Sequence, residues 1–206
     1  MQVADTQLLH CYFDKVNSKL ETVNTNMKSA ESSKELAFEW ECDLDLMRAL
    51  IIYQDEKRVG DFVRMAQPWL AGNEAKPQKK AYRIIEDIVC DEKKILGLAQ
   101  SMQLFDNSRD AVKPTSKASR LRSLSHITQL FDDEPNPIVR KFLFETAVEA
   151  VCAVEEVNEK AKTAAHALLV DVGRVLQRWS PDGPQEAIYD YLTKLLKGIF
   201  QYFACG

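Results

Sequence analysis

Apolar residues recur every three or four positions along most of the chain, and this spacing predicts α-helices. The pattern is clear from the start, where Phe13, Val16 and Leu20 fall on one face of a helix. Nine helices are predicted in this way, at approximately residues 5–23, 33–53, 55–70, 77–88, 92–104, 117–131, 137–151, 158–179 and 184–203. The pattern therefore indicates an all-α protein.

Residues that stop or start helices separate these segments. Ser33 is suited to cap the second helix, and Pro77 is suited to open the fourth because the first turn needs no N–H there. Gly72 and Asn73 should end the third helix, since both tolerate a left-handed backbone. The chain has only 7 Gly and 7 Pro, fewer than the turns of an all-β or nucleotide-binding fold usually require.

The predicted helices start at a nearly constant interval. Pro77, Lys117 and Asn158 lie 40 and 41 residues apart, and Ser33 lies 44 residues before Pro77. A helix-pair period of about 40 residues is typical of HEAT and armadillo arrays, whereas a closed helical bundle needs no constant period. The sequence thus predicts an α-solenoid of about four and a half HEAT/armadillo-type repeats in a single array over residues 1–206. The predicted repeats span about residues 1–53, 54–92, 93–133 and 134–179, with 184–203 starting another.

The last predicted helix closes in the apolar segment GIFQYFACG, where a natural solenoid would carry a polar capping repeat. We therefore expect the chain to be a fragment of a longer array.

The sequence holds no pattern that predicts catalysis, a cofactor or a metal. It lacks GxxxxGK[ST], GxGxxG, HExxH, CxxC and GxSxG. His10, His126 and His166 are far apart, and each lies inside a predicted helix. The five cysteines are odd in number and widely spaced, at Cys11, Cys42, Cys90, Cys152 and Cys205. We therefore expect them to be reduced thiols, mostly in the core of an intracellular protein. The chain is not predicted to be an enzyme, to take a small-molecule substrate or to enter a membrane.

Charge is unevenly distributed along the chain. Residues 76–125 carry 11 Lys and Arg against 6 Asp and Glu, although the whole chain has a net charge of −4. Basic residues lie near the helix starts at residues 77, 117 and 158, one repeat apart, so they would align if the repeats stack and could then neutralise RNA phosphates. These candidate contact residues for RNA or a protein partner are Lys76, Lys79, Lys80, Arg83, Lys117, Arg120, Arg122, Lys160 and Lys162. The alternative is that they decorate a solvated helix or pair with acidic residues of the preceding repeat.

An acidic run lies in the second predicted helix, at Glu39, Glu41, Asp43 and Asp45. A helix spreads residues at alternate positions around its circumference, so the carboxylates should not converge on one cation. The better interpretation is a solvated helix face that can also contact a basic partner.

Three of the predicted helices resemble one known family. The segment QKKAYRIIE at residues 78–86 resembles QKKAYR(V/I)LE of the HEAT-repeat ribosomal RNA processing protein twelve family, and SRLRSL at residues 119–124 is similar to that family's next basic helix start. The most specific match is residues 156–173, which resemble EV(S/N)xxARxAAxxLLVE(M/I)G in order and spacing. Lys160 and Lys162 stand where arginine is commoner, so a bidentate phosphate contact would be weaker there.

The resemblance implies a nuclear and nucleolar factor that can also shuttle to the cytoplasm. Such a factor acts in small-subunit ribosome assembly, pre-rRNA processing and export. Such a protein is a non-catalytic scaffold that binds pre-ribosomal RNA and assembly proteins. Family members are far longer than 206 residues, in agreement with the fragment expected above. The sequence leaves one alternative open, a protein-only HEAT adaptor or karyopherin-like transport protein.

Overall fold

The structure is a computed structural model that describes residues 3–27, 34–72, 74–91, 96–131 and 136–179, together with Thr193 and Lys197. Throughout these ranges the regular structure is helical, with eight α-helices, one short 3₁₀ turn and no strand. The all-α prediction is confirmed. The predicted helix at 184–203 and the expected cap at Ser33 lie outside the described ranges.

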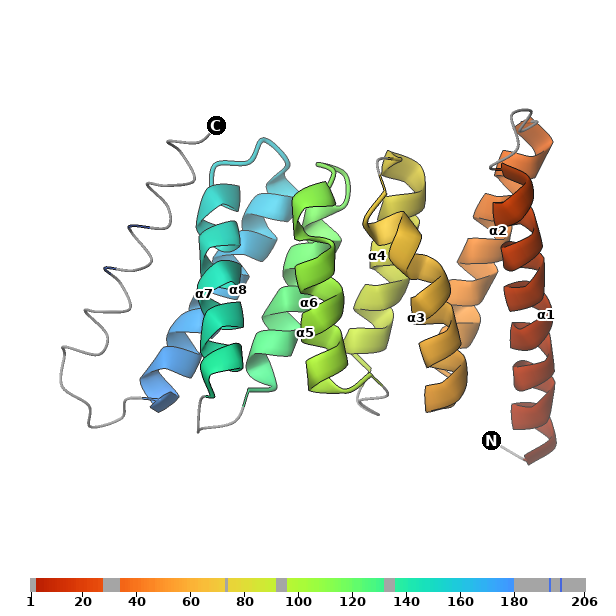
Figure 1. Cartoon of the computed structure of the whole chain (residues 1–206), viewed down its shortest axis with the longest axis horizontal. Helices are drawn as coiled ribbons and strands as arrows, with labels where there is room; N and C mark the ends of the chain where they lie inside the picture. Colours follow the sequence, from red (N-terminus) through yellow and green to blue (C-terminus); the bar gives the residue numbers. More distant parts are fainter. Residues whose placement is uncertain are drawn as a thin grey trace. The chain divides into compact units, whose positions relative to one another are not determined.

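The described chain forms two compact units. The first comprises residues 1–97 and 108–113, and the second comprises residues 98–107 and 114–206. Figure 1 shows the helices coloured along the chain. No helix in the described ranges is long and apolar enough to cross a lipid bilayer.

The first unit contains α1 (Val3–Met27), α2 (Lys34–Ile51), α3 (Glu56–Leu70) and α4 (Ala75–Val89), with the 3₁₀ turn η1 (Arg109–Ala111). Helix α1 packs on α2, α3 packs on α4, and α2 also packs on α4. Its core is aromatic at the centre, where Trp69 meets Trp40 edge-to-face at 5.4 Å between ring centroids. Phe62 contacts the same indole ring at 6.5 Å.

The second unit contains α5 (Leu98–Asn107), α6 (Lys117–Gln129), α7 (Pro137–Ala153) and α8 (Glu159–Trp179). Helix α6 packs extensively on α8, and α7 also packs on α8. The contact surface of α8 carries the fully or nearly buried Ala161, Ala164 and Ala165. Because alanine is small, the backbone of a neighbouring helix can approach α8 closely there.

Within each unit, the second helix of one pair packs on the second helix of the next. This arrangement is compatible with a helical solenoid, in which each pair buries its apolar face against its neighbour. The classification of these pairs as HEAT repeats, with the boundaries given above, stays a prediction.

Local sequence accounts for most helix boundaries. Asp55 caps α3 by accepting a hydrogen bond from the Arg58 N–H at 2.9 Å, and Asn136 caps α7 in the same way at 2.9 Å from the Val139 N–H. Helix α4 begins at Ala75, two residues before the predicted start. Pro77 still lies in the first turn, since the first intrahelical bond comes from the Gln78 N–H to the Glu74 carbonyl.

Three local expectations were wrong. Helix α5 begins at Leu98 rather than near residue 92, because Leu96 and Gly97 are not helical. Gly72 does not take the left-handed conformation expected of it; instead, an added Cβ would lie 2.8 Å from the Pro68 carbonyl oxygen, so close approach of the backbone requires glycine. Free thiols were expected mainly in the core, yet Cys11, Cys42 and Cys90 are exposed.

Candidate interaction surface

The basic residues that were predicted to form a binding surface fall into two groups in the structure. Some are held in ion pairs between packed helices, and others stay available on the surface.

In the first unit, α2 and α4 are joined by ion pairs along their length. The Lys76 ammonium lies 3.3 Å from the Glu41 carboxylate, and Lys80 pairs with Asp45 one turn further on. Further along, Arg48 of α2 forms a two-pronged ion pair with Asp87 of α4. Because the partners follow the same order along both helices, α2 and α4 run parallel.

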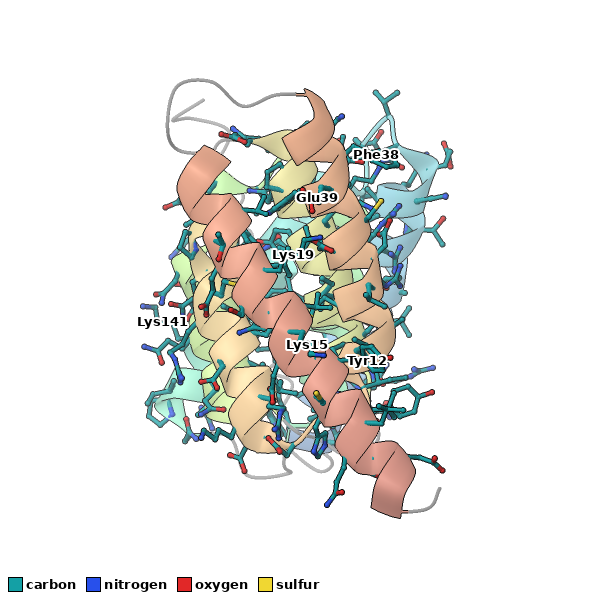
Figure 2. All side chains as sticks on the ribbon, turned by 90° about the vertical axis from the view of Figure 1, so that its right-hand side faces the viewer. Tyr12, Lys15, Lys19, Phe38, Glu39 and Lys141 are labelled. Atoms are coloured by element: carbon teal, nitrogen blue, oxygen red, sulfur yellow. The ribbon has the colours of Figure 1, made fainter. Side chains whose placement is uncertain are left out.

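These pairs give the acidic run of α2 a clear role. Glu41 and Asp45 face α4, whereas Glu39 and Asp43 face α1 and share Lys19, at 2.7 and 3.1 Å from its ammonium nitrogen. Figure 2 shows Lys19 of α1 pointing toward Glu39 of α2. The two carboxylates raise the pKa of Lys19, chiefly through the hydrogen bond that its ammonium group donates to Glu39. The four acidic positions are therefore divided between two sides of α2, and Asp43 is buried, whereas a solvated face was expected.

Lys79 and Arg83 of α4 behave differently. They are one helical turn apart and half-buried, and within the described ranges neither forms an ion pair. Lys80, which lies between them, pairs with Asp45, and three other residues of the motif point inward. Gln78, Ala81 and Tyr82 are fully buried, and the Tyr82 hydroxyl lies 3.0 Å from the Ser108 hydroxyl. Lys79 and Arg83 are therefore the part of this motif that a ligand can reach.

Gln78 explains why that motif begins with glutamine. Its side-chain amide nitrogen donates to the carbonyls of Leu70 and Ala111, at 2.9 and 2.7 Å, and lies 3.3 Å from the Gly72 carbonyl oxygen. Its carbonyl oxygen accepts from the Lys113 N–H at 2.7 Å. One side chain thus satisfies buried backbone groups of the α3–α4 turn and of the segment around η1. Neither the hydrophobic pattern nor the charge pattern predicts that Gln78 binds the backbone of these segments.

Arg120 corrects one of the predicted contact residues. Its side chain is fully buried, with the guanidinium group 2.6 and 3.0 Å from the two carboxylate oxygens of Glu149 and 5.3 Å from the ring centroid of Phe105. The prediction failed because it treated every basic residue near a helix start as exposed. Arg120 instead shares the buried stripe of Leu124 and Ile127, which follow it by four and seven residues.

The remaining candidates of the second unit lie near the surface of α6 and α8. Lys117 is ion-paired with Glu156, which places the starts of α6 and α8 side by side. Arg122 is exposed and donates to the Ser119 hydroxyl at 3.2 Å. Lys160 is exposed and Lys162 half-buried, and no ion pair involves either of them among the residues described. Three predicted cations of this unit thus remain accessible.

The motif at residues 156–173 also contains a residue that connects two helices by hydrogen bonds. Asp171 of α8 is buried and accepts hydrogen bonds from Ser125 and Gln129 of α6. Arg174 lies 3.0 Å from its second carboxylate oxygen. The acidic residue in this motif therefore holds α8 against α6.

Among the described residues, several ionisable groups meet at the surface of α1. An open hollow of about 630 Å³ beside α1 carries ionisable groups, but its Arg58 is bound to Asp14 at 2.8 and 3.0 Å and to Asp55 at 2.6 Å. The Arg58 contacts lower the pKa of both carboxyl groups, through a side-chain hydrogen bond for Asp14 and mainly a backbone one for Asp55. In the same ranges, no group of three or more His, Cys, Asp or Glu residues could hold a metal ion.

Comparison with known proteins gives the chain its relatives. No protein-family model matches it. It is 29% identical over 206 residues to an RRP12-like protein of Gallus gallus and 28% identical over 205 residues to an RRP12-like protein of Homo sapiens, with 97% of this chain covered in both. It is 28% identical over 145 residues, or 68% of this chain, to "Ribosomal RNA-processing protein 12" of Saccharomyces cerevisiae.

The family resemblance inferred from the three motifs is thereby confirmed. The chain spans only about 15% of the length of the chicken and human relatives and about 11% of the yeast one. These alignments are consistent with a chain that corresponds to one segment of such a protein.

Proposed function

We propose that this chain is part of a non-catalytic scaffold in ribosome biogenesis, acting in pre-rRNA processing, small-subunit assembly and export. The observation that carries this proposal is the similarity over 97% of the chain to RRP12-like proteins, together with the yeast relative whose name states a role in ribosomal RNA processing. A nuclear and nucleolar location follows from the same proposal.

The surface chemistry supports a binding role. Ion pairs join helices within each unit: the surface pair of Lys80 with Asp45 in the first unit, and the buried Arg120 with Glu149 in the second. In the second unit Lys160 and Lys162 form no ion pair among the described residues and can contact RNA phosphates, and Arg122 is exposed. Lysine acts on phosphates as a point charge and reads no base sequence, which suits a scaffold that binds RNA through its backbone.

Affinity purification of the full-length parent protein from cells tests this proposal. We expect precursor rRNA of the small subunit and small-subunit assembly proteins to co-purify, and imaging should place the protein in the nucleolus. A nuclease-treated sample identifies the protein partners that do not depend on RNA. Recovery of transport cargo without precursor rRNA would overturn the proposal in favour of the karyopherin-like alternative.

A further inference from the structure

The outer face of α2 carries large apolar side chains that no helix of its unit covers. Phe38 is 71% exposed and Leu46 is 45% exposed, and Cys42 between them is also exposed. These three residues are spaced by four, so they form one stripe, which Ala49 and the 41% exposed Tyr53 extend toward the end of the helix. Figure 2 shows Phe38 pointing away from α1. We call these five residues the α2 stripe.

The α2 stripe occupies a defined arc of its helix. Glu39 and Asp43 mark the side that faces α1, and Glu41 and Asp45 mark the side that faces α4. The buried residues Trp40, Leu44 and Met47 lie on the opposite side. At 100° per residue, the α2 stripe falls between the two ion-paired edges and points away from the core.

Positive charge lies beside the α2 stripe, on the next helix. Lys79 and Arg83 of α4 lie beyond the row of pairs formed by Glu41 and Asp45, and packed helices are separated by about 8–10 Å. The acidic groups of α2 are already compensated by Lys19, Lys76 and Lys80, so they add little net charge to the face. Among the described residues, the face therefore combines an apolar stripe with a cationic edge that forms no ion pair.

We infer that the α2–α4 face docks an amphipathic helix of a protein partner, with apolar side chains against the α2 stripe and acidic side chains against Lys79 and Arg83. A helix that presents apolar residues at i, i+4 and i+7 matches a stripe of this spacing. Its acidic edge would complement the two cations and set its orientation. This inference rests on the proposed scaffold function and assigns one of its protein contacts.

The chemistry of this face favours a protein helix over RNA. The exposed side chains of the α2 stripe are apolar, and burial of such surface is the dominant favourable contribution in protein association. The α2 stripe itself carries no cation, so a phosphate backbone running along it would meet no complementary charge there. The surface of α6 in the second unit differs, since its accessible residues include Arg122, His126 and Gln129 and, within the described ranges, form no aromatic stripe.

Selection from a library of helical peptides provides the test. The peptides share a fixed apolar stripe and differ in the charged residues beside it. Peptides that bind the 206-residue chain are kept, and those that also bind its F38A/L46A variant are removed. We expect selected peptides to carry Glu or Asp along one edge. Their affinity, measured by fluorescence anisotropy, should fall at least tenfold in F38A/L46A and at least tenfold in K79E/R83E.

Two matched variants separate this contact from general effects. I138A/V170A removes apolar groups that are 73% and 54% exposed in the second unit, and K15E/K57E makes the same charge change on α1 and α3. Both should bind the selected peptides as the unaltered chain does, and circular dichroism should show all four variants folded. Enrichment of basic peptides, or equal losses in the matched variants, would overturn the inference.

Two further outcomes would assign the face to another occupant. Dimerisation in analytical ultracentrifugation that F38A/L46A abolishes would point to a second copy of the chain. Loss of affinity for a single-stranded RNA oligonucleotide in F38A/L46A would point to RNA. The peptide measurements contain no RNA, so their failure is distinct from a failure to recover precursor rRNA with the parent protein.

Discussion

The starts of α4 and α6 have similar sequences but opposite structural roles. Both begin with a basic cluster followed by an apolar stripe. In α4, Lys79 and Arg83 stay accessible, whereas in α6 the arginine at position 120 is fully buried against Glu149. The difference lies in register: Arg120 precedes Leu124 and Ile127 by four and seven residues, which places it on the buried face. A basic helix start is therefore a poor marker of a binding surface unless its register is considered.

The largest effect should come from breaking the buried pair. Arg120→Ala leaves a large cavity and an unpaired carboxylate, and we expect it to lower the free energy of unfolding by about 3–5 kcal/mol. Urea denaturation followed by circular dichroism measures this change. Arg83→Ala on α4 is the matched control and should cost less than about 0.5 kcal/mol. A loss below about 1 kcal/mol in Arg120→Ala would contradict the structural role.

The second largest effect should come from Gln78. Gln78→Ala leaves the buried backbone groups near residues 70, 111 and 113 without their partner, and we expect a loss of about 3 kcal/mol. Amide hydrogen exchange should also accelerate at residues 108–113. The exposed Gln67→Ala in α3 is the control and should change neither quantity. Unchanged exchange at residues 108–113 in Gln78→Ala would show that this contact does not hold the segment.

Arg58 tests an exposed ion pair in the same unit. Arg58 keeps the pKa of Asp14 and Asp55 below their ordinary values. A carboxyl group with a lowered pKa stabilises the fold above its unfolded pKa, and this contribution is lost as the pH falls through its folded pKa. In Arg58→Gln, NMR titration should show both pKa values rising, with a stability loss at pH 7 of at most about 1 kcal/mol because the carboxylates are half-exposed. Unchanged pKa values would contradict this assignment.

The smallest effect should come from the row of pairs between α2 and α4. Lys80→Gln removes one ion pair at the surface, and we expect a loss of about 0.5 kcal/mol that disappears at high salt. Lys79→Gln, which breaks no ion pair within the described ranges, should cost nothing measurable. The difference between the two variants, measured by urea denaturation at low and high salt, isolates the pair. Equal stabilities at low salt would show that it contributes nothing.

The sequence was sufficient to predict the helices and much of their core. The spacing of Phe13, Val16 and Leu20 predicts that they share one helix face, and all three are buried. Ion pairs between distant residues could not be predicted in this way, because no local sequence pattern relates Lys80 to Asp45 or Arg120 to Glu149. The inward side of Arg120 was nevertheless visible in its spacing from Leu124 and Ile127. Exposure of the α2 stripe needed the structure, because an apolar residue at helical spacing is usually in the core.

The most direct test of the account is the salt dependence of RNA binding by the 206-residue chain. We expect the affinity for a single-stranded RNA oligonucleotide to fall with salt, and K160E/K162E to weaken binding and reduce the slope of log K against log salt by about one to two. K15E/K57E, with the same change in net charge, should leave the slope unchanged. A slope that is zero in the unaltered chain, or reduced equally by both variants, would contradict a specific RNA contact by the accessible cations.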